Sequence, residues 1–175
     1  MKQKKFMTLV GAMGLVGVMS TIGALAEAHD HDDDPPTAAE IAFASGASDL
    51  MTNTVVAALV QEIGETTPAN AAQGSLSIGL IFNDRNRDMR LVGKLNPLSN
   101  NDYPADSFEH HALAEAMTGQ AATSVERVDG QWYYRRSVPL SNFAPQCQMC
   151  HSNFSTLAST DWVGAVMLRL PINTH

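Results

Sequence analysis

The 175-residue chain contains only two cysteines, Cys147 and Cys150, and two residues separate them. A disulfide between them would close a loop too short to brace the fold. The roughly 149 residues after position 26 are enough to bury a hydrophobic core without such cross-links. We therefore expect the two cysteines to serve a chemical purpose.

Basic residues are also scarce, with 11 Lys and Arg against 18 Asp and Glu. Three of them, Lys2, Lys4 and Lys5, lie in the first five residues, so the remaining chain has 8 basic against 18 acidic residues, a net charge of −10. An acidic chain without a basic patch repels phosphate backbones. Nucleic acid is therefore not an expected partner, whereas a basic protein that docks by charge is compatible with this composition.

Residues 1–26 have the features of a secretory leader. A short basic start is followed by an uncharged stretch over 6–26, which ends in the small-x-small sequence Ala24-Leu25-Ala26. The alternative is a retained membrane anchor, because 21 uncharged residues can just span a bilayer. We favour the leader and, finding no second uncharged run of that length, predict an exported, soluble, periplasmic protein.

Residues 27–36 form an acidic segment that ends in two prolines, and they are expected to be a solvated linker. His29 and His31 alternate with aspartates here and could bind a transition metal, although short His/Asp tracts at chain ends are usually just hydrated. The remaining residues, 37–175, are expected to form one folded domain.

A long helix should open the folded domain. Thr37 and Glu40 form a capping box, and apolar residues then recur at helical spacing to about Gly64. From 75 to 95, apolar residues instead alternate with smaller ones on both sides of a polar turn at 83–87. That alternation predicts a pair of strands.

The second half of the domain should continue with a helix and three strands. Asp106 and Glu109 form a second capping box, opening a helix that ends near Gly119. The dipeptide Asp129-Gly130 predicts a tight hairpin between strands 124–128 and 131–140, and a final strand covers 162–172. Helices thus bracket antiparallel hairpins, so the predicted fold class is α+β.

The segment Cys147-Gln148-Met149-Cys150-His151 matches the C-x-x-C-H pattern of covalent c-type haem attachment. Two thiols three positions apart on a helical turn can add to the two vinyl groups on one porphyrin edge. The following residue, His151, then projects under the ring as the proximal iron ligand. Attachment of this kind takes place outside the cytoplasm, which agrees with a leader.

Besides the attachment of one haem c, the C-x-x-C-H segment has three alternative interpretations. A thioredoxin-like redox pair would need a strand-helix-strand context that the sequence lacks. A structural zinc site would need a fourth ligand, and there is no second cysteine pair. The third alternative is a simple disulfide. Haem is favoured because the whole cysteine complement of the chain lies in this one motif.

The second axial position of the iron would set its potential and reactivity. Met149 lies inside the attachment loop and cannot reach the opposite face. The remaining candidates are methionines and a histidine pair: Met51, Met89, Met117, Met167, His110 and His111. Core packing explains each methionine equally well, and surface exposure explains the histidines. An open second axial position that holds water is therefore a further alternative.

Haem propionates need cationic or hydrogen-bonding partners. Arg135 and Arg136 lie on the strand that leads into the motif, and because alternate residues face opposite sides of a sheet, only one of them can face the haem. Arg90 and Lys94 are further candidates. Surface solvation explains any of these basic residues equally well.

Residues 93–109 resemble a loop in a bacterial c-type haem family with a PAS-like fold. The stretch 134–140, the attachment motif and Gly164-Ala165 follow in the order of that family, and the similarity covers roughly residues 37–172. The resemblance implies an antiparallel PAS-like sheet, with a long N-terminal helix and flanking helices, around one covalent haem. Such domains occur as free-standing cytochromes or as sensor modules.

The chain departs from this family in two places. Its loop lacks an arginine between Leu95 and Asn96, and it has no third cysteine. The resemblance implies that some members ligate the far side of the iron with a cysteine from the N-terminal helix. If that helix still covers the far face, the resemblance implies Met51 as the replacement ligand.

These observations lead to three functional hypotheses, in order. The first is an exported single-haem c-type cytochrome that acts in electron transfer or redox response through a separate partner protein. The second is a periplasmic haem-based gas or ligand sensor subunit with an open distal site. The third, a small haem peroxidase, would need a distal acid-base group such as His110 or His111.

Overall fold

The computed structural model describes residues 34–82, 88–93 and 103–173. The predicted leader, His29 and His31, the turn at 83–87 and Lys94 lie outside these described residues. So does most of the loop on which the family resemblance partly rests. The domain boundaries given above therefore remain predictions.

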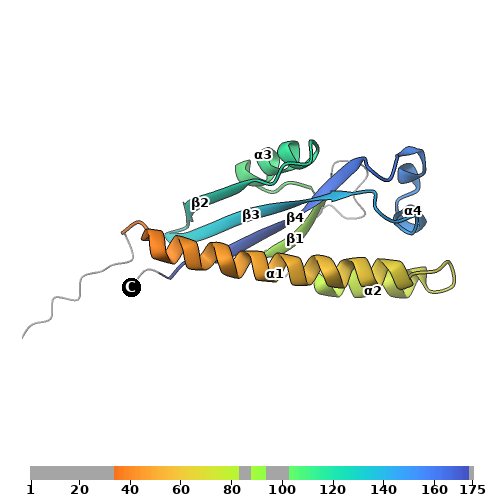
Figure 1. Ribbon diagram of the computed structural model, residues 1–175, viewed down its shortest axis with the longest axis horizontal. Helices are drawn as coiled ribbons and strands as arrows, with labels where there is room; N and C mark the ends of the chain where they lie inside the picture. The colour runs from red at the N-terminus through yellow and green to blue at the C-terminus, as the bar shows by residue number, and fades with distance from the viewer. Residues whose placement is uncertain (1–33, 83–87, 94–102, 174–175) are drawn as a thin grey trace, which may run out of the picture.

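A four-stranded antiparallel sheet forms the centre of the molecule, with the strand order β1-β4-β3-β2 (Figure 1). Its strands are β1 (Met89–Gly93), β2 (Thr123–Val128), β3 (Gln131–Ser141) and β4 (Trp162–Pro171). The two longest strands, β3 and β4, pair along most of their length in the middle of the sheet. The α+β class with an antiparallel sheet and a long N-terminal helix is confirmed.

Helices cover both faces of this sheet. The long helix α1 (Ala38–Glu65) and the adjacent α2 (Ala71–Ile81) lie on one face, and α3 (Ser107–Ala116) lies on the other (Figure 1). The short α4 (Cys147–Cys150) and a 3₁₀ helix (Ser152–Thr156) stand at one end of the sheet. Side chains alternate along the strands, so each strand contributes to both layers of the core.

Helix α1 begins as predicted. The Thr37 hydroxyl accepts the Glu40 N–H at 3.3 Å, and the Glu40 carboxylate accepts the Thr37 N–H at 2.7 Å. The side chains that α1 buries lie at helical spacing along one face: Ala44, Ser48, Thr52 and Leu59. By length and composition alone, α1 is also a candidate membrane-crossing helix, although no second apolar run was expected from the sequence. In this structure its buried face contacts β3 and β4.

The prediction of a strand over 75–82 is wrong, because this segment belongs to α2. The residues that face the core follow helical spacing: Gly74 and Phe82 are buried, and Ile78 packs against the buried cluster of Leu59, Phe82 and Val166. Leu76 and Leu80, which the alternating pattern had placed beside them, are 66% and 75% exposed. The predicted strand after the turn is confirmed as β1.

The other predicted elements are confirmed with small changes. Asp106 caps α3 by accepting the Glu109 N–H at 2.9 Å, but the Glu109 carboxylate accepts the Ala105 N–H instead of closing a full capping box. The hairpin of β2 and β3 turns through Asp129 and Gly130, with φ values of 51° and 86°. These positive values are those a two-residue primed turn requires.

Candidate functional site

The two cysteines lie on a single helical turn that follows β3. The Cys147 N–H donates to the Ala144 carbonyl at 3.1 Å, and the His151 N–H donates to the Cys147 carbonyl at 2.9 Å. Since Cys150 and His151 follow Cys147 within this turn, all three side chains of the motif project from one short segment. The turn is therefore built as the attachment motif requires.

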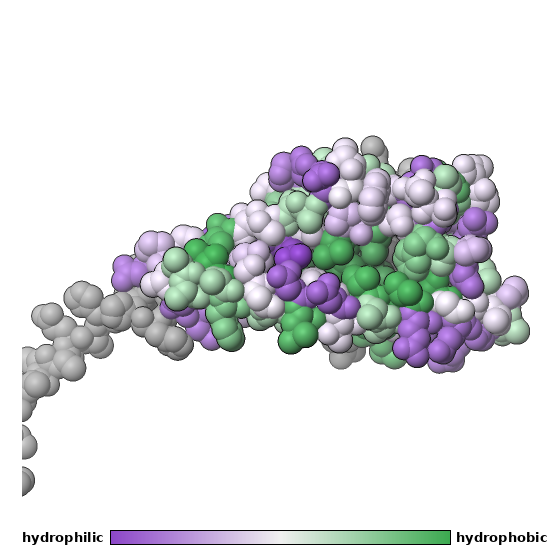
Figure 2. Space-filling view, viewed as in Figure 1, coloured by the Kyte–Doolittle hydropathy of each residue, from purple (hydrophilic) through white to green (hydrophobic). Residues whose placement is uncertain are grey.

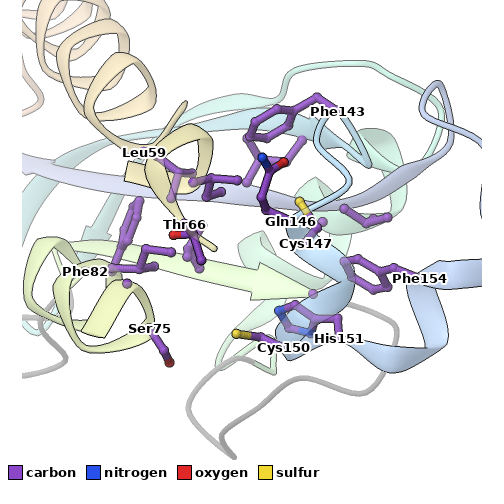
Figure 3. A pocket seen from close by; sticks show the side chains of 18 of the residues that line it. Leu59, Thr66, Ser75, Phe82, Phe143, Gln146, Cys147, Cys150, His151 and Phe154 are labelled. Carbon is purple, nitrogen blue, oxygen red and sulfur yellow. The ribbon is translucent and has the colours of Figure 1, made fainter. Parts of the chain in front are cut away.

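This turn forms one wall of a cavity of about 350 Å³, whose lining includes Cys147, Cys150 and His151 (Figure 3). Leu59, Thr66 and Phe82 lie across the cavity from the motif. The floor is the end of the sheet, where β1, β3 and β4 meet. Figure 2 shows hydrophobic side chains gathered on the surface between α1 and α4, over this end of the sheet. The volume lies within the range of sites for cofactors and small ligands.

Cys147 and Cys150 are both partly buried, and the structure places no disulfide between them. Burial raises the pKa of the Cys147 thiol, which backbone hydrogen bonds lower only in part. A thiol of this kind is protonated at neutral pH, unlike the activated thiolate of a redox motif. The thioredoxin-like alternative therefore has no support in either the topology or the environment of Cys147.

A zinc site would require a different arrangement of the motif. Within the described ranges, no three His, Cys, Asp or Glu side chains converge so that they could hold a metal ion. Zinc would need Cys147, Cys150 and His151 to point at one centre, whereas haem needs the thiols along a ring edge and the imidazole beneath the ring. The separated side chains along an apolar cavity fit a covalently attached haem.

His151 is held by an aromatic neighbour. Its ring stacks on Phe154 of the 3₁₀ helix, with centroids 4.6 Å apart and an angle of 11° between the ring planes. Phe154 is buried and also lines the cavity. Stacking on a buried ring restricts the orientation of the imidazole, which is what a proximal ligand needs.

Arg135, one of the two predicted propionate partners, does not line the cavity. It is 3% exposed and lies on the α3 face of the sheet, where its Nη1 is 2.8 Å from the Asp106 carboxylate and its guanidinium lies over Phe108. Burial lowers the pKa of Arg135, but the hydrogen bonds that it donates to Asp106 and Glu126 raise the pKa above its ordinary value overall. The Arg135 side chain therefore connects the start of α3 to β3.

Arg136 lies on the opposite face of the sheet, as the strand alternation predicted. It pairs with Asp49 of α1 and does not line the cavity either. Arg90, a further candidate, is buried and pairs with Glu109 at 2.7 Å. None of these three arginines is therefore placed at the cavity in this structure.

The candidate distal ligands are also placed away from the cavity. Met51 is 40% exposed on α1 and is not among the lining residues. Met89, Met117 and Met167 pack in or against the hydrophobic clusters, as the packing alternative predicted. His110 and His111 are exposed on α3, on the far side of the sheet. The structure brings together only the three residues of the attachment motif.

Sequence reasoning did not identify the opposite wall of the cavity. Leu59, Ile63 and Thr66 line it from α1, and Ile78 and Phe82 line it from α2. The α1 residues share one helix face by their spacing of four and three positions, so the periodicity could have grouped them. Nothing in the sequence indicated that this face meets the motif, which is more than 80 residues away.

The chain was compared with protein families and with curated proteins. No curated protein matches it. Residues 18–164 match the family described as Tll0287-like, and the match begins inside the predicted leader. Because this match covers well over half of the chain, the chain belongs to the Tll0287-like family.

Proposed function

We propose that this protein is an exported c-type cytochrome that carries one haem, bound covalently to Cys147 and Cys150 and ligated by His151. Its function would be electron transfer or a redox response. The observation that carries the proposal is that both cysteines and the histidine of the C-x-x-C-H motif line a mainly apolar cavity. The family match supports it, because Tll0287, which gives the family its name, is a cyanobacterial c-type cytochrome-like domain.

The residues of the chain have distinct tasks in this proposal. The thiols of Cys147 and Cys150 would hold the haem through thioether bonds, and the imidazole of His151, which stacks on Phe154, would ligate its iron. The cavity walls are mainly apolar, and the polarity around a haem affects its reduction potential. The bound haem would supply reversible one-electron chemistry, and Met149, which is 41% exposed within the motif, marks the side where the motif meets solvent.

Export and the nature of the partner belong to the same proposal. Haem attachment outside the cytoplasm requires the leader proposed for residues 1–26. An acidic protein that exchanges electrons is best matched by a basic partner, because opposite charges accelerate the encounter. We propose such a redox partner.

The proposal is tested by producing the chain in a host with haem-attachment machinery and recording reduced spectra. The wild type should show one haem c per chain and a reversible midpoint. Cys147→Ala and Cys150→Ala should each lose one thioether bond, which shifts the reduced absorption band and lowers haem content. Met149→Ala, inside the same motif, is the matched control and should retain full haem. Equal spectra for all four proteins would contradict the proposal.

A further inference from the structure

The segment that carries the motif leaves the sheet at the end of β3 and returns to it at the start of β4. Ser141, the last residue of β3, pairs with Trp162, the first residue of β4. The Asn142 N–H then donates to the Asp161 carbonyl at 2.8 Å. Residues 143–160, which include the motif and the 3₁₀ helix, therefore form one excursion whose two ends are joined at Asn142 and Asp161.

The side chain of Asn142 reaches into this excursion. It is 4% exposed, and its Nδ2 donates to the Leu157 carbonyl at 3.2 Å and to the Phe154 carbonyl at 3.4 Å. Because carbonyl oxygens only accept hydrogen bonds, the amide nitrogen and not the amide oxygen must face them. The Asn142 side chain thus connects the 3₁₀ helix and the residue after it to the end of β3.

Asn142 is not the residue that stability alone would favour at this position. Its Oδ1 is buried and makes no hydrogen bond within the described ranges. A buried acceptor without a partner lowers stability, and each such group calls for an explanation. The hydrogen bonds of Nδ2 offset this cost, so the feature that depends on Asn142 is the position of the 3₁₀ helix.

Phe154 connects Asn142 with the histidine of the motif. The Phe154 N–H donates to the His151 carbonyl at 2.9 Å, and the buried Phe154 ring stacks on the His151 imidazole (Figure 3). A shift of the Phe154 backbone would therefore move the ring on which the imidazole rests. Groups behind a metal-ligating histidine fix the orientation of its ring and tune the metal.

From these contacts we infer that Asn142 is a positioning residue for the proposed iron ligand: by holding the carbonyls of residues 154 and 157, it fixes the Phe154 ring and thereby the plane of the His151 imidazole. Asn142 is not among the residues that line the cavity, so it acts through Phe154. The inference deepens the proposed function, on which its redox consequence rests. The orientation of the imidazole belongs to the polypeptide and can be tested without haem.

The first test is proton NMR of the full chain without haem. The His151 ring protons, identified by their loss in His151→Gln, should be shifted upfield by the stacked Phe154 ring. Asn142→Leu and the smaller Asn142→Ala both remove the Nδ2 donor and should lose most of this shift. Asp161→Ala is the matched control, because the exposed Asp161 carboxylate accepts the Ala158 N–H in the same excursion at 2.8 Å. It should keep the shift, and an unchanged His151 signal in both Asn142 variants would overturn the inference.

The second test is the midpoint potential of the holoprotein. Asn142→Leu and Phe154→Leu should each shift the potential, whereas Asp161→Ala should leave it at the wild-type value. Because Asn142 acts through Phe154, the double variant should shift the potential no further than Phe154→Leu alone. Additive shifts would overturn the inference, since Asn142 would then act by another route. A wild type without haem would instead contradict the proposed function, and the NMR test would still decide the role of Asn142.

Discussion

At the scale of single residues, the charges buried between α3 and the sheet form a connected cluster. Glu109, 3% exposed, accepts hydrogen bonds from Arg90 Nη1 and from the Ala105 N–H, both at 2.7 Å. Arg90 also donates to the Tyr103 carbonyl at 3.0 Å, and Arg135 lies 3.7 Å from the other Glu109 oxygen. The cluster thus joins β1, β3 and the chain segment that enters α3.

Replacing Arg90 by Met should destabilise the protein. Removing one partner of a buried ion pair leaves the other charge poorly compensated, which lowers the free energy of unfolding by about 3 kcal/mol. Arg169→Met is the control, because Arg169 is more exposed and lies 3.6 Å from Asp88, where loss of the pair should cost less than about 1 kcal/mol. Denaturant unfolding of both variants measures the difference, and equal losses would show that the Glu109 cluster contributes little.

Asp106 makes the same region sensitive to acid. Burial raises the pKa of this carboxyl, but hydrogen bonds from Arg135 and from the Glu109 N–H lower it below its ordinary value overall. A depressed pKa contributes stability above the ordinary carboxyl range, and this contribution is lost as the pH falls through the lowered pKa.

The variant Asp106→Asn isolates this effect, since Asn is also a good N-cap residue. The wild type should be the more stable protein at neutral pH, and the difference should shrink as the pH falls below about 4. Thermal unfolding of both proteins across this range gives the result. A difference that does not change with pH would mean that the charge of Asp106 is not responsible.

At the scale of secondary-structure elements, α1, α3, β1, β4 and the hairpin could be predicted because local signals and tertiary packing agree there. The segment of α2 could not. Its apolar residues fit both a strand, through Leu76, Ile78 and Leu80, and a helix, through Ile78 and Phe82. Asn70 at its start is a residue type that caps helices, but its side chain makes no cap hydrogen bond to α2. The packing of Ile78 against the cluster of Leu59, Phe82 and Val166 favours the helix over the strand.

The two periodicities predict different mutational effects on α2. Ile78→Ala should lower the free energy of unfolding by about 1–2 kcal/mol, because Ile78 packs against a buried cluster. Leu80→Ala should change it by less than about 0.5 kcal/mol, because Leu80 is 75% exposed and Ala favours helix. In a strand both side chains would face the same side. Similar losses in the two variants, measured by denaturant unfolding, would therefore contradict the helix.

Met51, which the family resemblance implied as the distal ligand, does not line the cavity. The buried face of α1 runs through Thr52 and Leu59, and each helical residue turns about 100° from the one before it. Met51 is therefore rotated away from the sheet, although it adjoins a buried residue. Only the pairing of α1 with the sheet fixes which of its faces meets the motif.

At the scale of the whole molecule, the attachment motif was readable from sequence because its five residues are contiguous. The cavity around it was not, since its walls come from α1, α2 and three strands that are distant in the chain. The arginines expected at the haem instead join helices to the two faces of the sheet. A resemblance in the motif thus predicts the anchor, whereas the distal environment depends on the tertiary structure.

The central claim is that one haem is attached by thioether bonds at Cys147 and Cys150. Intact-mass measurement of the denatured protein, produced with haem-attachment machinery, tests it most directly, because only a covalent haem survives unfolding. We predict the mass of the processed polypeptide plus one haem. The mass of the bare polypeptide would contradict the account.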